Sequence, residues 1–134
     1  MTKIWDRLYL GSFKDAELLA TTNPQRIRAV VSLCEEEVPR ASNINYAHLP
    51  ISDARPIPAE RFDEIMTAME RGLRKGNLFV HCLGGASRSP IMVAAWLQRC
   101  GYAAIDKALA EISELRDIQP SPTLLRSVRG HLSR

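Results

Sequence analysis

Residues 81–89, HCLGGASRS, combine the groups that are needed to bind an anion and to attack it. An apolar run leads into Cys82 and a second apolar run follows Arg88, so the segment is a loop between a predicted strand and a predicted helix. Gly84 and Gly85 let such a loop curl until its backbone N–H groups point at one centre. Together with the helix N-terminus, those groups favour a tetrahedral dianion.

Side chains of this loop predict phosphoryl transfer. The planar guanidinium of Arg88 matches two oxygens of a phosphate. The surrounding donors favour the thiolate form of Cys82, and a thiolate beside a bound phosphate is a nucleophile. Ser89 is adjacent and could donate its hydroxyl to the Cys82 sulfur. His81 is interpreted as a buried residue that orients the loop, because an ionised cysteine needs no base.

A separate carboxylic acid is needed to protonate the leaving oxygen, a contribution typically worth about 10²–10⁴ in rate. Asp53 is our candidate, because it follows a predicted strand in a loop punctuated by prolines. One helix and one strand then return the chain to Cys82 at the same sheet edge. The alternative interpretation is that Asp53 only shapes the turn. Asp63 is a rival acid, but it lies on the polar side of a predicted helix.

Other interpretations compete for the same loop. A lone cysteine in a small loop is often inert and buried. A nucleotide-binding P-loop needs a Gly-Lys-Ser/Thr run, and no lysine lies between positions 15 and 74 or between 76 and 106. His81 and Cys82 lack the CxxC or HxxxH partner that a metal site needs, so a metal site is not indicated.

The elements that must position these residues alternate between strands and helices. Short β-branched or apolar runs predict strands, and longer runs with apolar residues at helical spacing predict helices. We expect a short strand pair or an edge strand over 4–10 and further strands over 27–33, 44–51 and 77–81. The expected helices cover 14–20, 59–73, 91–100, 103–115 and 123–132. The strand–helix–strand order around 44–81 requires a crossover and so a largely parallel sheet. We therefore predict a three-layer α/β fold with a sheet of four to five strands and helices on both faces.

Length and composition fit one globular domain of 134 residues. A hydrophobic content of 46 % excludes a mainly disordered chain. No run of about 18 apolar residues is present to span a membrane. The net charge of +3 is dispersed, so no nucleic-acid partner is expected. Three widely spaced cysteines and the lack of a secretory signal pattern favour a cytoplasmic protein, and nothing indicates more than a monomer.

The motif at 81–89 resembles the HCxxGxxR[ST] loop of cysteine-dependent protein tyrosine phosphatases, and the rest is similar to their compact, atypical dual-specificity branch. The likeness covers nearly the whole chain, in LYLGS at 8–12, RAVVSLCE at 28–35, LPISD at 49–53 and RDIQP at 116–120. This sequence differs from the family at two positions of that region: Asp117 stands where the family often has Pro, and Ser121 where it often has Asn. The resemblance implies the phosphotyrosine protein phosphatase II-like fold and a single catalytic domain over residues 1–134.

Carried over to this sequence, the resemblance implies a phosphocysteine intermediate on Cys82. Arg88 would bind the phosphoryl oxygens and stabilise the transition state, and Ser89 would assist breakdown of the intermediate. Asp53 would act first as acid and then as base for water. The backbone amides expected to bind phosphate are those of Leu83, Gly84, Gly85, Ala86, Ser87 and Arg88. The resemblance implies no metal and no cofactor, and phosphate, sulfate or vanadate can occupy such a site.

The expected substrate is a phosphorylated protein or peptide. A compact chain without the segment that deepens the pocket of strict tyrosine phosphatases would admit phosphoserine and phosphothreonine beside phosphotyrosine. The alternatives are a phosphoinositide, a nucleic-acid 5′-phosphate or a sugar phosphate. The uncharged residues 83–87 favour a phosphopeptide, although Arg55 could contact a second charge. A non-catalytic module would need a broken site, and a rhodanese-type sulfurtransferase or arsenate reductase would leave Asp53 unexplained.

Cys34 follows the predicted 27–33 strand, which we expect beside the strand that precedes Cys82. In some lipid-phosphatase relatives a cysteine in this position pairs with the catalytic one under oxidation. Cys34 is therefore a candidate redox partner that would protect Cys82 from overoxidation. The alternative is a small buried apolar residue, which is also our interpretation of Cys100.

Overall fold

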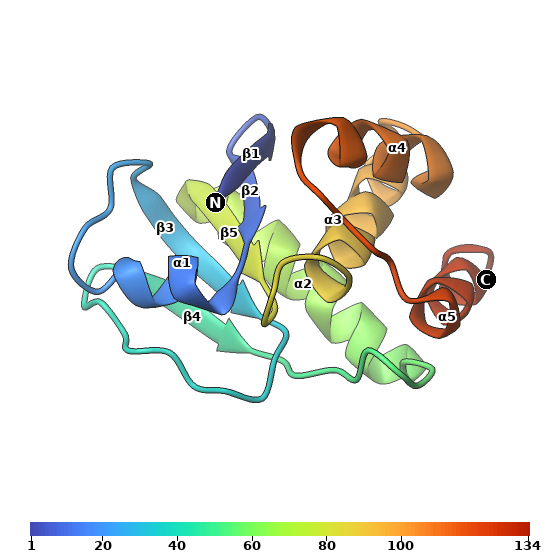
Figure 1. Ribbon diagram of the computed structural model, residues 1–134, viewed down its shortest axis with the longest axis horizontal. Helices are drawn as coiled ribbons and strands as arrows, with labels where there is room; N and C mark the ends of the chain where they lie inside the picture. Colours follow the sequence, from blue (N-terminus) through green and yellow to red (C-terminus); the bar gives the residue numbers. More distant parts are fainter.

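A five-stranded sheet forms the centre of the structure, a computed structural model that describes residues 1–134 (Figure 1). The strands are β1 (Thr2–Trp5), β2 (Leu8–Gly11), β3 (Ile27–Ser32), β4 (Asn45–His48) and β5 (Asn77–His81). They lie in the order β1-β2-β5-β3-β4, and only the β1–β2 pair is antiparallel. The predicted, mostly parallel α/β sheet is confirmed.

Five helices cover the two faces of this sheet unequally. They are α1 (Phe13–Leu18), α2 (Ala59–Lys75), α3 (Arg88–Arg99), α4 (Ile105–Leu115) and α5 (Pro122–Leu132). On one face α2 and α3 contact the strands, and α4 and α5 pack against α3. Only the short α1 covers the opposite face (Figure 1). The three predicted layers are therefore present, and one of them is thin.

Alternation along the central strand β5 directs its side chains to different layers. Leu78, Val80 and Cys82 belong to the larger core with α2 and α3, whereas Phe79 belongs to the smaller core with α1. The ring of His81 stacks on Phe79, with centroids 5.6 Å apart. Cys82 and His81 therefore face opposite layers, although they are adjacent in the sequence.

The carboxyl ends of the parallel strands meet at one edge of the sheet. In the strand register, Gly11 and Ser32 both lie opposite His81, and Ser32 also lies opposite His48. Open α/β sheets bind ligands outside this edge. The loop that begins at Cys82 and the ends of β2, β3 and β4 are thereby collected in one place.

The segment after β4 stays beside β3 as far as the edge of the sheet. Leu49 N–H donates to the carbonyl oxygen of Ser32 at 2.8 Å, and Ile51 N–H donates to that of Leu33 at 3.0 Å. The strand expected over 44–51 is shorter than predicted, but its continuation keeps the sheet's hydrogen bonding. This extension delivers Asp53 to the edge where Cys82 lies.

The helix after the 82–87 loop begins at Arg88, earlier than the predicted Ile91. Pro90 is compatible with this start, because in the first turn its missing N–H would have no helical partner anyway. The earlier start places the N-terminus of α3 directly at the loop.

Two glycines inside helices predict opposite effects of the same substitution. A methyl group at Gly72 in α2 would lie 2.8 Å from Leu78 Cδ1 and 3.1 Å from Ala29 Cβ, whereas at Gly130 in α5 it would meet nothing within 4 Å. We expect Gly72→Ala to destabilise the protein by about 1–3 kcal/mol through overpacking. Gly130→Ala should stabilise it by roughly 0.5–1 kcal/mol, because glycine loses more chain entropy in a helix. Chemical denaturation of both variants measures the difference, and shifts of the same sign would contradict it.

Candidate active site

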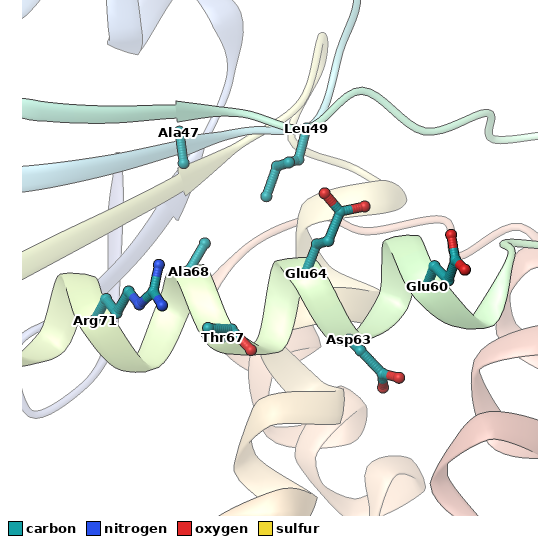
Figure 2. Close-up of a pocket in the computed structure, with 8 residues that line it drawn as sticks. All are labelled: Ala47, Leu49, Glu60, Asp63, Glu64, Thr67, Ala68 and Arg71. Carbon is teal, nitrogen blue, oxygen red and sulfur yellow. The ribbon is translucent and has the colours of Figure 1, made fainter.

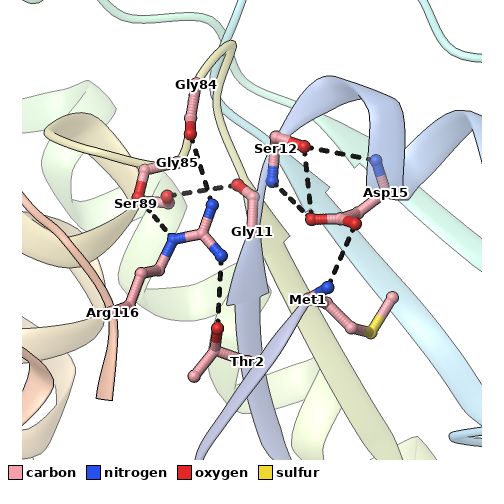
Figure 3. A network of polar contacts seen from close by, with 9 residues as sticks. All are labelled: Met1, Thr2, Gly11, Ser12, Asp15, Gly84, Gly85, Ser89 and Arg116. Atoms are coloured by element: carbon pink, nitrogen blue, oxygen red, sulfur yellow. Dashed lines mark hydrogen bonds and ion pairs between the residues drawn. The ribbon is translucent and has the colours of Figure 1, made fainter.

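The loop between β5 and α3 is held from outside through its carbonyl groups. Arg116, at the end of α4, donates from Nε to the carbonyl oxygen of Gly85 at 3.0 Å and from Nη2 to that of Gly84 at 3.3 Å (Figure 3). Its third nitrogen donates to the hydroxyl of Thr2 in β1 at 3.2 Å. A planar guanidinium can make these contacts together because its donors form a rigid fork.

Main-chain donors hold the carbonyl groups on either side of the two glycines. Phe13 N–H donates to the carbonyl oxygen of Leu83 at 2.9 Å, and Gln119 N–H donates to that of Ala86 at 2.7 Å. The first donor comes from the start of α1 and the second from the segment before α5. Four successive carbonyls, from residue 83 to residue 86, are thus bonded to other parts of the chain.

The amide groups of the same loop are free. None of the backbone N–H groups of residues 83–89 donates a hydrogen bond within the protein. Within a planar trans peptide the C=O and the following N–H point in opposite directions. Carbonyls held on the outside therefore turn the amides inward, toward the N-terminus of α3. Such a ring of N–H groups at a helix N-terminus is an anion-binding nest.

Gly85 is the position where this conformation requires glycine. Its φ is +72°, a left-handed value that other residues adopt only with strain. A Cβ there would collide with the guanidinium of Arg116 and would lie 2.8 Å from the backbone of Gly11. At Gly84 a Cβ would meet nothing within 4 Å, so only the second glycine of the pair is sterically required.

Cys82 lies beneath the loop with only 2 % of its surface exposed. Its Sγ is 3.3 Å from the Oγ of Ser89, which is fully buried in the first turn of α3. The Ser89 hydroxyl also lies 3.5 Å from the carbonyl oxygen of Gly11, at the limit of a hydrogen bond. The structure thus brings together the two side chains that the sequence paired, and the shorter contact is the one to sulfur.

His81 is held as a neutral ring. Its Nδ1 lies 3.1 Å from the carbonyl oxygen of Cys82, which can only accept, so Nδ1 carries the hydrogen. Its Nε2 then accepts from the Ser32 hydroxyl at 2.6 Å. Burial lowers the pKa of His81, which favours the same neutral form. The ring fixes the carbonyl that precedes the nest, from the opposite face of the sheet to the Cys82 side chain.

Asp53 reaches the nest from the loop after β4. Its Oδ1 accepts a hydrogen bond from the Ser87 hydroxyl at 2.5 Å, although the residue is otherwise exposed. Arg88, half-buried at the start of α3, donates from Nη1 to the carbonyl oxygen of Ile51 at 3.2 Å. The rival acid Asp63 instead pairs with Arg134 at 2.9 Å. Of the two carboxylates, only Asp53 contacts the loop.

Cys34 is fully buried just beyond the end of β3 and forms no disulfide. Burial is the main factor that raises the pKa of its thiol, and the nearby charge of Glu36 acts in the same direction. Its strand is hydrogen-bonded to the one that precedes Cys82. Its role as a redox partner stays a prediction. Cys100, at the end of α3, is exposed, so its interpretation as a core residue is wrong.

An open hollow of about 700 Å³ lies elsewhere, between β4 and α2 (Figure 2). It is lined by three carboxylates, those of Glu60, Asp63 and Glu64, and by the single base Arg71. An excess of negative charge disfavours a phosphate in this hollow. No group of three or more His, Cys, Asp and Glu side chains is placed to bind a metal ion.

Two contributors to this site were not identified from the sequence. The sequence singles out Arg116 only as part of the family-like segment RDIQP at 116–120, and it gives the Ser87 side chain no role. No local pattern indicates that either side chain reaches a distant partner. The only available signal is an arginine placed directly after a predicted helix, which is too common to be informative.

Comparison with known proteins identifies the class. The sequence model of the family described as "Dual specificity phosphatase, catalytic domain" matches residues 8–133. The chain belongs to this family, and the resemblance drawn from residues 81–89 is confirmed.

Individual relatives agree with this assignment. Dual specificity protein phosphatase 15 of Rattus norvegicus is 32 % identical over 125 residues, which cover 91 % of this chain and 53 % of the relative. Dual specificity protein phosphatase 22-A of Danio rerio is 30 % identical over 118 residues, covering 87 % and 57 %. A crystal structure of DUSP15 has 30 % identity and a TM-score of 0.83, covering 98 % of this chain and 84 % of that one. The chain spans about half the length of the curated relatives it matches.

The contacts of Arg116 predict a specific loss of anion binding. Arg116→Lys keeps the charge but cannot hold the carbonyls of Gly84 and Gly85 together, so the amides lose their common direction. We expect the affinity for inorganic vanadate to fall by roughly 10-fold or more, since small misplacements in such sites are costly. Calorimetric titration measures this. The control is Arg126→Lys, an exposed arginine of α5; equal affinities in both variants would refute the prediction.

Proposed function

We propose that this chain is a catalytic domain that hydrolyses phosphotyrosine, together with phosphoserine and phosphothreonine, in proteins. The observation that supports the proposal is a loop above Cys82 whose backbone amides donate to no group of the protein, with Arg88 at the start of the following helix and the Asp53 carboxyl group bonded to Ser87 of the loop. In this proposal residues 1–134 act as one catalytic domain. Phosphorylated proteins or peptides are its substrates.

In the first step, the Cys82 thiolate attacks phosphorus and the bond to the substrate oxygen breaks. Asp53 donates its proton to that oxygen, so the product leaves as a neutral alcohol or phenol. The equatorial phosphoryl oxygens gain charge in the transition state, and the amides of residues 83–88 with the Arg88 fork stabilise it. No reorganisation is needed at that moment, because outside donors already hold the loop carbonyls.

In the second step, the Asp53 carboxylate takes a proton from water, which attacks the phosphocysteine. The phosphorus–sulfur bond breaks and inorganic phosphate forms. Sulfur leaves with the electron pair, and the Ser89 hydroxyl 3.3 Å away can donate a hydrogen bond to the thiolate. His81 takes no proton in either step, because its ring lies on the far side of the sheet from the Cys82 side chain and its Nε2 is occupied by the Ser32 hydroxyl.

The composition of the nest supports a phosphopeptide over a more highly charged substrate. Residues 83–87 carry no charged side chain, and half of the Leu83 surface is exposed at the loop. A polyphosphorylated inositol or nucleotide would need additional bases around the bound phosphate. Arg55, exposed two residues beyond Asp53, could serve a second phosphate, so phosphoinositides and other phosphate monoesters stay in the substrate panel.

Hydrolysis of phosphopeptides tests the proposal. We expect turnover of phosphotyrosine and phosphothreonine peptides, measured as released phosphate. Cys82→Ser should abolish it, because a serine hydroxyl is a poor nucleophile without a base. Asp53→Asn should lower kcat by roughly 10²–10⁴. The matched control is Cys100→Ser, which alters the exposed cysteine at the end of α3 and should stay active.

Two outcomes would contradict the proposed function. Full turnover by Cys82→Ser would exclude a phosphocysteine intermediate. Release of phosphate from inositol phosphates, nucleic-acid 5′-phosphates or sugar phosphates, without turnover of any phosphopeptide, would move the chain to the alternative substrate classes.

Cys34 adds a prediction about reversible oxidation. Peroxide would convert the Cys82 thiolate to a sulfenic acid, and the Cys34 thiol would attack that sulfur to form a disulfide with loss of water. We expect mild peroxide to inactivate the wild type in a way that a dithiol reverses, and Cys34→Ser to be inactivated irreversibly. Peptide mapping by mass spectrometry checks this, with Cys100→Ser as control. Sulfinic or sulfonic Cys82 without a link to Cys34 in the wild type would refute it.

The cytoplasm is our proposed location, and the three free cysteines support a reducing compartment. No helix in the structure combines the length and the apolar character that a membrane crossing requires.

A further inference from the structure

The side chain of Ser87 lies between Asp53 and the start of α5. Its hydroxyl oxygen is 2.5 Å from Asp53 Oδ1 and 2.8 Å from the backbone nitrogen of Ser121. Only 8 % of Ser87 is exposed, whereas Asp53 is exposed. A nearly buried hydroxyl thus contacts an otherwise solvent-facing carboxyl group.

The direction of these two hydrogen bonds follows from chemistry. A backbone N–H can only donate, so Ser121 uses a lone pair of the Ser87 oxygen. An ionised carboxylate can only accept, so the single hydroxyl proton of Ser87 is directed at Oδ1 of Asp53. While this hydrogen bond is kept, a proton taken up by the carboxyl group sits on the other oxygen, Oδ2.

Ser87 occupies the N-cap position of α3, where a serine side chain usually caps its own helix. Such a side chain accepts a hydrogen bond from the first turn of that helix. Here the side chain makes no such bond, and its backbone angles are φ −131° and ψ −69°. The hydroxyl is turned to the loop that carries Asp53, and the first amides of α3 stay available to an anion.

A neighbouring contact holds the same loop in register. Arg88 donates to the carbonyl oxygen of Ile51, two residues before Asp53, at 3.2 Å. Adjacent residues of one loop therefore fix the backbone and the carboxyl group of the other. The Ile51 contact sets where the loop lies, and the Ser87 contact sets how the carboxyl group is turned.

We propose that Ser87 is a positioning residue that determines which oxygen of Asp53 carries the transferable proton and keeps that oxygen toward the leaving group. The proposal rests on the proposed function. It gives a role to the side chain of Ser87, a residue that otherwise contributes only its backbone amide to the proposed phosphate site. Without the hydroxyl, the proton of Asp53 is free to occupy either oxygen, and the carboxyl group is free to rotate into solvent.

The test is the dependence of kcat on the leaving group, measured with a series of aryl phosphates. Phenols of low pKa depart without a proton, whereas phenols of high pKa need the acid. For Ser87→Ala we expect a loss of roughly 10-fold with the poorest leaving groups and almost none with the best. In the wild type we expect kcat to change little with the pKa of the leaving phenol, and Ser87→Thr, which keeps the hydroxyl, should behave in the same way. Asp53→Asn lacks the acid and should show the steepest fall of kcat with increasing phenol pKa.

Two controls separate positioning from damage to the nest. Inhibition by vanadate should be equal in Ser87→Ala and wild type, because the amides remain. Ser113→Ala removes an exposed hydroxyl that bonds only within α4, and it should leave the leaving-group dependence unchanged. If Ser87→Thr does not fold, the comparison of Ser87→Ala with Ser113→Ala still decides the matter.

The outcomes are distinguishable from failure of the proposed function. An equal loss in Ser87→Ala across all leaving groups, with Asp53→Asn still steep, would overturn this proposal alone. A flat dependence in Asp53→Asn would overturn the assignment of Asp53 as the acid and the role of Ser87 with it.

Discussion

The direction of a few peptide planes governs the rest of this site. A loop of small, uncharged residues binds an anion only if its N–H groups share one direction, and nothing within residues 83–87 enforces that. The direction is set by the carbonyl groups of the same peptide units. These carbonyls accept hydrogen bonds from the backbone N–H groups of Phe13 and Gln119 and from the side chain of Arg116. The cradle is therefore assembled by tertiary structure. Elements remote from the chemistry, such as β1 through Thr2, become part of it.

Strand alternation explains why neighbouring residues of the motif have separate tasks. Cys82 faces the thick layer of α2 and α3, whereas His81 faces the thin layer of α1 and stacks on Phe79. On that side the ring lies in a dry environment, and burial keeps it neutral. A histidine in this place can hold a carbonyl but cannot reach the sulfur. In the proposed mechanism, His81 therefore does not serve as the base for Cys82.

Much of this arrangement was predictable from local pattern. The β-branched run at 27–33 and the short apolar runs at 44–51 and 77–81 indicated strands of one parallel sheet, and the common direction of the last two brought Asp53 and Cys82 to one edge. What could not be predicted is which distant groups the long side chains and the loop amides form hydrogen bonds with. Arg116 bonds to residues far from it in the sequence, and neither propensity nor periodicity encodes such a partner.

The unused cap of α3 links stability to function. An N-cap serine that bonds its own helix typically stabilises a protein by about 1 kcal/mol, and Ser87 forgoes that bond. If its hydroxyl capped the helix, it would occupy an amide that the phosphate needs, and Asp53 would lose its only hydrogen-bond donor in the protein. By turning outward, the same hydroxyl leaves the helix N-terminus free for the anion and orients the acid beside it. In the proposed reaction, stabilisation of the phosphoryl group and protonation of the leaving group would thus both depend on one rotamer, that of Ser87.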